Sequence, residues 1–130
     1  MLFGIHASLV REILPPPEIT PAPLAPPAVH GLFNLRGEIV TALDLRILLG
    51  MPPRSGGSRP KHLVFDQAGD VVSLLIDRVG NVVEVEELSK EAVPGNLPES
   101  VISHIHDVFR LEDRLLFILD FQKLLKGSPA

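Results

Sequence analysis

The chain has 130 residues, with 12 Lys and Arg against 16 Asp and Glu, which gives a formal net charge of −4 at pH 7. This length predicts one domain over residues 1–130, and a hydrophobic content of 45% is enough to form a core. The acidic balance argues against nucleic-acid binding, and the absence of cysteine excludes disulfides and thiolate chemistry. The longest apolar run, Leu115 to Leu119, is too short for a membrane span, and Met1–Gly4 shows no secretory signal. We therefore expect a cytoplasmic protein.

A proline-rich segment, Pro15 to Pro27, interrupts the chain early. Because proline lacks an amide donor and fixes φ, this segment is expected to be an extended connector. We interpret it as a stiff crossover that packs on the surface through Ile19, Leu24 and Val29. The alternative, a polyproline ligand for an SH3-type partner, lacks a basic residue beside its PxxP core.

Short β-rich runs separated by turn signals predict two strand pairs. In the first pair, Leu32 to Leu35 and Ile39 to Leu43 flank the turn Arg36-Gly37-Glu38. In the second pair, His62 to Phe65 and Val71 to Ile76 flank the turn at residues 67–70. Two short helices are predicted after capping aspartates, from Asp44 to Leu49 before Gly50 and from Asp120 to Lys126 before Gly127. Many short strands with little helix indicate a mostly β fold, either a small barrel or a sandwich.

An internal repeat indicates two similar lobes. A shift of 76 positions aligns apolar and capping residues, namely Phe33 with Phe109, Leu43 with Leu119, Asp44 with Asp120 and Leu48-Leu49 with Leu124-Leu125. A shift of 72 aligns Val10–Ile13 with Val82–Val85. One such unit alone would bury too little apolar area to be stable, so we expect the two units to pack together.

No pattern in the sequence predicts an active site. His104 and His106 would share one face of a strand, but a zinc site usually needs three or four protein ligands, and none completes the set. There is no GxSxG nucleophile motif, and Asp44 and Asp120 are explained as helix caps. We therefore expect neither catalysis nor a cofactor or metal.

Charged residues within apolar strands leave two interpretations open. Arg36 lies in a tight turn, and Glu12 lies on the strand ahead of the prolines. Each could be a solvated surface residue, with Glu12 discouraging edge-strand aggregation, or part of a binding surface.

The sequence resembles the CheW-like family, the coupling proteins of bacterial chemotaxis. The matching segments are VREIL (10–14), ITPAPLAPPAVHGLFNLRGEIVTALDLRILLG (19–50), HLVF (62–65), SLLIDRVGNVVEV (73–85) and RLEDRLLFILDFQKLL (110–125). The block NLRG…DLR…LG followed by LLIDRV is specific to that family. Thr41 departs from the pattern, because the family usually has proline there.

The resemblance implies two intertwined SH3-like β-barrels around a shared core, and a non-catalytic adaptor. Such proteins bridge the cytoplasmic tips of chemoreceptors to the regulatory domain of the histidine kinase CheA in signalling arrays at the membrane. By motif position, Val10, Glu12, Arg36 and Val82 match receptor-contacting residues that line a groove between the lobes. Valines would contact a helix of the receptor, and the two charges would fix its orientation.

Two other functions compete with the chemotaxis adaptor. A CheW-like scaffold of a non-chemotactic receptor cluster would have the same sequence features. A small nucleic-acid-binding barrel would be expected to carry a basic face and stacking Tyr or Trp, which the chain lacks.

The repeat and the resemblance both predict a missing strand. By the 72-residue shift, the strand pair formed by His62–Phe65 and Leu75–Val85 should have a counterpart near the N-terminus. The counterpart of His62–Phe65 would lie upstream of Met1. The strand expected from Phe3 to Leu9 would then lie at a sheet edge. We expect a start site placed too late, or an edge satisfied by self-association, strand exchange or a partner.

The histidine interpretation can be tested with a double variant. His104→Ala combined with His106→Ala should leave the Tm almost unchanged, with or without a chelator, because no structural metal is expected. A fall of many degrees on chelation would contradict this prediction.

Overall fold

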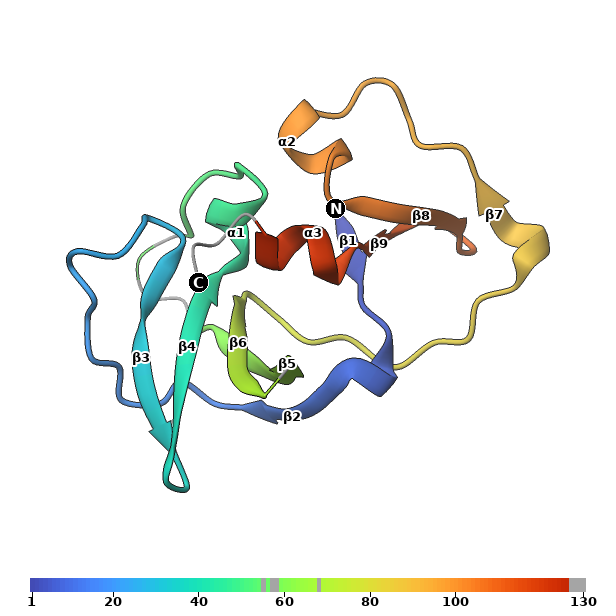
Figure 1. Ribbon diagram of the computed structural model, residues 1–130. Coiled ribbons are helices and arrows are strands. Elements are labelled where there is room, and N and C mark those ends of the chain that lie inside the picture. The colour runs from blue at the N-terminus through green and yellow to red at the C-terminus, as the bar shows by residue number, and fades with distance from the viewer. Residues whose placement is uncertain (55, 57–58, 68, 127–130) are drawn as a thin grey trace.

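The computed structural model describes residues 1–54, 56, 59–67 and 69–126, and it consists mainly of two β-sheets (Figure 1). The first sheet has the strand order β2 (Val10–Leu14), β5 (Lys61–Gln67), β6 (Asp70–Ile76), β4 (Glu38–Asp44) and β3 (Val29–Leu35). The second has the order β1 (Leu2–Gly4), β9 (Leu115–Leu119), β8 (Ile105–Arg110) and β7 (Lys90–Glu91). The predicted mostly β architecture with two lobes is confirmed.

The helical elements are short. They are η1 (Ala7–Leu9), α1 (Leu45–Leu48), η2 (Glu87–Ser89), α2 (Glu99–Ile102) and α3 (Phe121–Lys126). In the described part of the chain, no helix is long and apolar enough to cross a membrane.

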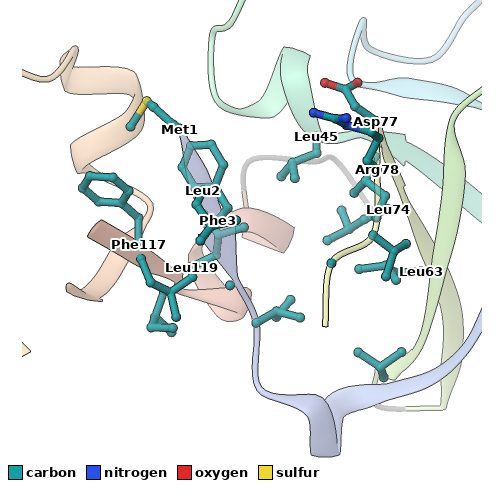
Figure 2. A pocket seen from close by; sticks show the side chains of 18 of the residues that line it. Met1, Leu2, Phe3, Leu45, Leu63, Leu74, Asp77, Arg78, Phe117 and Leu119 are labelled. Atoms are coloured by element: carbon teal, nitrogen blue, oxygen red, sulfur yellow. The ribbon is translucent and has the colours of Figure 1, made fainter. Parts of the chain in front are cut away.

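The two lobes exchange segments of the chain. β1 belongs to the second sheet, whereas β2 crosses into the first sheet a few residues later. After the second sheet is complete, α3 returns to lie between the lobes (Figure 1). Figure 2 shows the facing sides, with Phe3 and Phe117 on the second lobe opposite Leu63 and Leu74 on the first.

The 76-residue repeat is confirmed in the backbone. The antiparallel pairs β3–β4 and β8–β9 shift register at equivalent places, between Val29 and Gly31 and between Ile105 and Asp107. Each pair also has one parallel neighbour, because β6 lies beside β4 and β1 lies beside β9. The two units therefore share their topology as well as their apolar pattern.

Both predicted aspartate caps are present. The Asp44 carboxylate accepts a hydrogen bond from the Arg46 amide at 3.0 Å, and the Asp120 carboxylate accepts one from the Lys123 amide at 3.1 Å. Gly50 follows α1 with a φ of 67°, a left-handed conformation that ends the helix. The second predicted stop, Gly127, lies outside the described residues.

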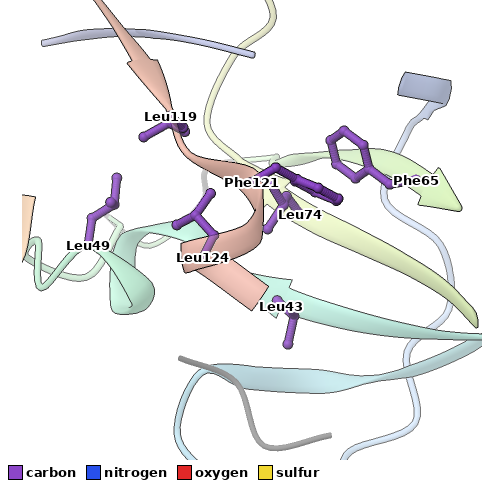
Figure 3. Packing of buried hydrophobic residues seen from close by; sticks show 7 residues of the cluster. All are labelled: Leu43, Leu49, Phe65, Leu74, Leu119, Phe121 and Leu124. Atoms are coloured by element: carbon purple, nitrogen blue, oxygen red, sulfur yellow. The ribbon is translucent and has the colours of Figure 1, made fainter. Parts of the chain in front are cut away.

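The largest core cluster is shared between the lobes (Figure 3). Its buried residues are Leu43, Leu49, Phe65 and Leu74 from the first lobe, and Leu119, Phe121 and Leu124 from β9 and α3. The rings of Phe65 and Phe121 lie 4.6 Å apart between centroids. Burial of each large side chain stabilises the fold by roughly 1.5–3 kcal/mol, so the lobes hold each other together.

Three expectations about local structure are corrected. Leu24 is fully exposed, so the proline-rich connector is anchored by Ile19 and Val29 without it. The strand expected to run to Val85 ends at Ile76, and no strand follows within 77–86. The N-terminal strand, expected from Phe3 to Leu9, spans only Leu2–Gly4, although it does lie at an edge.

One buried polar pair lies within the first sheet. His62 on β5 and Ser73 on β6 are almost fully buried, and His62 Nδ1 lies 3.0 Å from Ser73 Oγ. The ring of Phe33 packs edge-on against the imidazole at 5.4 Å. Burial lowers the pKa of His62 from 6.5 to about 4, with smaller contributions from the nearby His30 and Arg54.

This pair predicts a pH dependence of stability. The unfolded chain binds a proton at His62 near pH 6.5, whereas the folded chain does so only near pH 4. The free energy of unfolding should therefore fall between pH 6.5 and 4, by up to about 3 kcal/mol from this residue. An NMR titration should find the His62 pKa near 4, and His62→Gln should flatten the loss of stability. A folded-state pKa above 6 would contradict the prediction.

Candidate binding groove and charged surface

A groove of about 1440 Å³ separates the two lobes. One wall is formed by β1 and β9 of the second lobe, including Phe3 and Phe117, and the other by α1, β5 and β6, including Leu63 and Leu74 (Figure 2). The segment 77–83, which leaves β6, also lines it. The groove is therefore largely apolar, with charged residues at its margin.

Three of the four residues predicted to bind a receptor line this groove. These are Val10, Glu12 and Val82, whereas Arg36 lies outside it. Val82 is 83% exposed, and Val10 is half-buried against the shared core. Arg36 is nevertheless connected to the groove, because its guanidinium forms an ion pair with Glu12.

The conformation of β2 explains why its adjacent charged residues, Arg11 and Glu12, form ion pairs with different parts of the first lobe. A register shift between Val10 and Glu12 interrupts the pairing of β2 with β5 at Arg11. Arg11 donates to Glu38 on β4 at 2.8 Å and to Asp66 on the adjacent β5 at 3.2 Å. Glu12 pairs with Arg36 and also lies 3.8 Å from Arg11 Nε, so β2 is connected to both the β3–β4 turn and β5.

Arg36 occupies the two-residue turn between β3 and β4. Arg36 and Gly37 have φ values of 49° and 91°, and the Gly37 amide donates to the Asn34 side chain at 3.0 Å. Two positive φ values are typical of the tight turns that match the twist of a hairpin. The turn thus fixes the direction in which the Arg36 side chain leaves the sheet.

These surface ion pairs contribute more to geometry than to stability. The hydrogen bond from Arg11 lowers the pKa of Glu38. Arg36 is mostly exposed, and an exposed pair of this kind typically contributes only about 0–1 kcal/mol. The arrangement offers a partner a fixed pattern of alternating charge beside apolar side chains.

A second charged cluster joins the DLR motif (44–46) to the LLIDR motif (74–78) through Arg46 and Asp77. Arg46 donates from Nε and Nη2 to the Asp77 carboxylate at 2.6–3.0 Å, and Arg54 Nε donates to it at 2.9 Å. Arg54 also donates to Asp44, the α1 cap, at 3.1 Å. The bonds from Arg46 and Arg54 lower the pKa of Asp77. This cluster fixes the beginning of the 77–85 segment against the first lobe.

Sequence reasoning missed two exposed apolar residues next to the predicted site. Ile13 is half exposed and lines the groove, and Ile39 is 63% exposed on β4. Ile39 follows the Arg36-Gly37 turn and pairs with Asn34 in the hairpin. The sequence could have revealed both residues, because side chains alternate between the two faces of a strand. This alternation places Ile13 on the outer face of β2 and Ile39 on the outer face of β4.

The histidines that suggested a metal site have protein partners. His104 Nδ1 lies 2.7 Å from the Ser100 carbonyl oxygen, and His106 Nδ1 lies 2.8 Å from Asp107 Oδ2. Only His106 is on a strand, because His104 precedes β8. Within the ranges that the structure describes, His, Asp and Glu nowhere form a metal-binding group of three.

Comparison with known proteins identifies the family. The family model for the CheW-like domain matches residues 1–128. The chemotaxis protein CheW of Treponema pallidum is 28% identical over 131 residues, covering 98% of this chain and 77% of that protein. The CheW of Rhizobium meliloti is 28% identical over 126 residues, covering 97% of this chain and 81% of that protein.

A solved structure has the same fold. The crystal structure of the scaffolding protein TtCheW from Thermoanaerobacter tengcongensis superposes with a TM-score of 0.80, at 24% sequence identity. The match covers 94% of this chain and 79% of that one. The chain thus belongs to the CheW-like family of non-catalytic chemotaxis coupling adaptors.

Proposed function

We propose that this adaptor couples the cytoplasmic tip of a chemoreceptor to the regulatory domain of the kinase CheA. In this proposal it acts in the cytoplasm and is recruited to receptor arrays at the membrane. Val10, Glu12, Arg36 and Val82 contact the receptor. The observation that carries the proposal is the ion pair between Glu12 and Arg36 at the margin of an apolar groove.

The chemistry of this surface suits a helical receptor tip. Val82 and Ile13 are exposed apolar side chains that a helix could cover. The Glu12–Arg36 pair lies beside them and presents both signs of charge, which favours one orientation of the partner over others. Because the pair is exposed, its contribution to recognition does not require a large contribution to folding.

The free edge of β1 supports a further contact through the N-terminal strand. β1 pairs with β9 on one side, and the described residues provide no strand on the other. An unpaired edge is a template for another polypeptide strand, so self-association through this edge is part of the proposal.

Reconstitution with purified partners tests the coupling function. The chain should co-purify with a receptor cytoplasmic tip and with a CheA regulatory domain from the same source. It should also increase the amount of receptor recovered with the kinase domain. Binding to oligonucleotides, with strong dependence on salt, would instead support a nucleic-acid-binding barrel. Failure to bind either signalling partner would contradict the proposal.

The role of Arg36 is tested by reversing its charge. Arg36→Glu should weaken receptor binding while the unfolding free energy changes by about 1 kcal/mol or less, because the side chain is exposed. Calorimetry with the receptor tip and thermal unfolding provide the two measurements.

A charge swap then separates direct contact from indirect positioning. Combining Arg36→Glu with Glu12→Arg restores an ion pair but reverses its direction. If the two charges contact the receptor, the double variant stays defective. If the double variant binds the receptor as well as the unmodified protein does, binding requires only that the ion pair forms, whatever its direction. If Arg36→Glu alone binds the receptor normally, Arg36 is not part of the receptor-binding site.

A further inference from the structure

Two ion pairs join β2 to the tip of the β3–β4 hairpin. Glu12 pairs with Arg36, and Arg11 donates to both carboxylate oxygens of Glu38, from Nη2 at 2.8 Å and from Nη1 at 3.4 Å. The charges are complementary in order, since a positive and a negative residue on β2 meet a negative and a positive residue on the hairpin. This arrangement favours one alignment of the two segments over a shifted one, which would bring like charges together.

No strand pairing holds the hairpin tip against β2. In the first sheet β2 and β3 lie at opposite edges, and among the described strands β2 pairs only with β5. The isolated bridge between Thr20 and Leu32 connects the proline-rich crossover to the middle of β3, not to its turn. The turn lies at the end of the hairpin that points away from α1 and α3 (Figure 1). Its position relative to β2 therefore depends on side chains.

Apolar packing ends before the turn is reached. Leu14 and Ile19 pack against a core cluster of the first lobe that includes Leu35 on β3 and Val40 on β4. Residues 36–39, which lie between these two core positions, are all exposed. The hairpin is thus anchored by its core up to Leu35 and from Val40 onward. Beyond that point the ion pairs orient it.

Arg11 is the residue that connects the two pairs. Its guanidinium donates to Asp66 of β5 at 3.2 Å as well as to Glu38, and its Nε lies 3.8 Å from Glu12. One side chain thus contacts the hairpin, the neighbouring strand and the carboxylate that pairs with Arg36. The hydrogen bond between Arg11 and Glu38 lowers the pKa of Glu38 and raises the pKa of Arg11, because each charge stabilises the other.

We propose that Arg11 is a positioning residue for receptor recognition, which holds the hairpin tip at β2 and thereby presents the Glu12–Arg36 pair in one orientation. The inference rests on the proposed function, in which Glu12 and Arg36 contact the receptor. Arg11 acts through these two residues, because its own donors are engaged by Glu38 and Asp66.

The loss of Arg11 would change the position of the turn and not its internal structure. The hydrogen bond from the Gly37 amide to the Asn34 side chain is local to the hairpin and would remain. The tip would, however, be free to move relative to Glu12. A receptor would then have to order the tip as it binds, which lowers affinity in the way that any loss of preorganisation does.

Two substitutions of Arg11, measured by calorimetry with a receptor cytoplasmic tip, test the proposal. Arg11→Gln and Arg11→Lys should each weaken binding about three- to tenfold, because neither side chain has the planar fork that reaches two carboxylates. Lysine keeps the net charge, so its defect would not come from long-range attraction. The matched control is Arg110→Gln, which removes the arginine of an ion pair with Glu91 in the second lobe and should leave binding unchanged.

A double-mutant cycle distinguishes positioning from direct contact. If Arg11 acts through its ion pair with Glu38, Glu38→Gln should reproduce the loss of affinity. The double variant Arg11→Gln with Glu38→Gln should then bind no more weakly than either single variant. Normal binding by Glu38→Gln, or losses that add in the double variant, would mean that Arg11 does not act through this pair and would overturn the proposal.

The free protein provides a measurement that does not depend on the receptor. In Arg11→Gln, an NMR titration should find the pKa of Glu38 higher than in the unmodified protein. Backbone order parameters at residues 36–38 should fall, while those of β5 and β6 stay the same. The Tm should change little, because exposed ion pairs contribute little to stability. Unchanged order parameters at the tip would contradict the positioning role.

Failure of this inference can be distinguished from failure of the proposed function. If Arg36→Glu weakens receptor binding and both Arg11 variants bind normally, only the positioning role is wrong. If Arg36→Glu binds normally as well, the receptor-binding site itself is wrong and the inference is overturned with it. Should Arg11→Gln fail to fold, Glu38→Gln still provides the test, because it breaks the same ion pair from the exposed tip.

Discussion

The packing of α3 and the end of β9 against the first lobe is the contact on which the rest of the structure depends. Leu119, Phe121 and Leu124 complete a core whose other buried members come from β4, α1, β5 and β6. Neither sheet alone contains enough buried apolar residues for an independent domain of ordinary stability. Because the contact is made by the last described helix, the chain through α3 is needed to fix the distance between the lobes and the shape of the groove.

Charged contacts arrange the margin of this groove without contributing much to its stability. Arg46 and Arg54 hold Asp77 beside the α1 cap, which determines where the 77–85 segment leaves the first lobe. Through ion pairs with Glu38 and Glu12, Arg11 and Arg36 connect β2 to the β3–β4 hairpin, which lies at the opposite edge of the sheet order. An adaptor without chemistry of its own needs such fixed directions, because its function depends on holding two partners in one relative orientation.

β1 forms part of the groove wall, and its two edges have different surroundings. β1 is fixed on one side by β9, and its Phe3 packs on Phe117 at 6.1 Å between ring centroids. Its other side faces the groove, as does the segment around Val82. The same region therefore combines exposed valines with a strand edge that no strand of the described residues covers.

Local sequence by itself determined the hairpins, the capped helices and the repeat. The Arg36-Gly37 turn, the Asp44 and Asp120 caps and the equivalence of residues 76 positions apart depend on short-range chemistry, and the structure confirms all of them. Family motifs identified the adaptor class and named Val10, Glu12, Arg36 and Val82, whose contacts with a receptor stay a prediction.

Only the tertiary structure decided which of these elements have partners. It brought Glu12 to Arg36 and Asp77 to Arg46, residues 24 and 31 positions apart, because strand crossing is not encoded in local patterns. It also left Leu24 exposed and the valines at 82–85 without a ladder. β propensity states what a segment can form, whereas a strand exists only where a neighbouring strand supplies its hydrogen bonds.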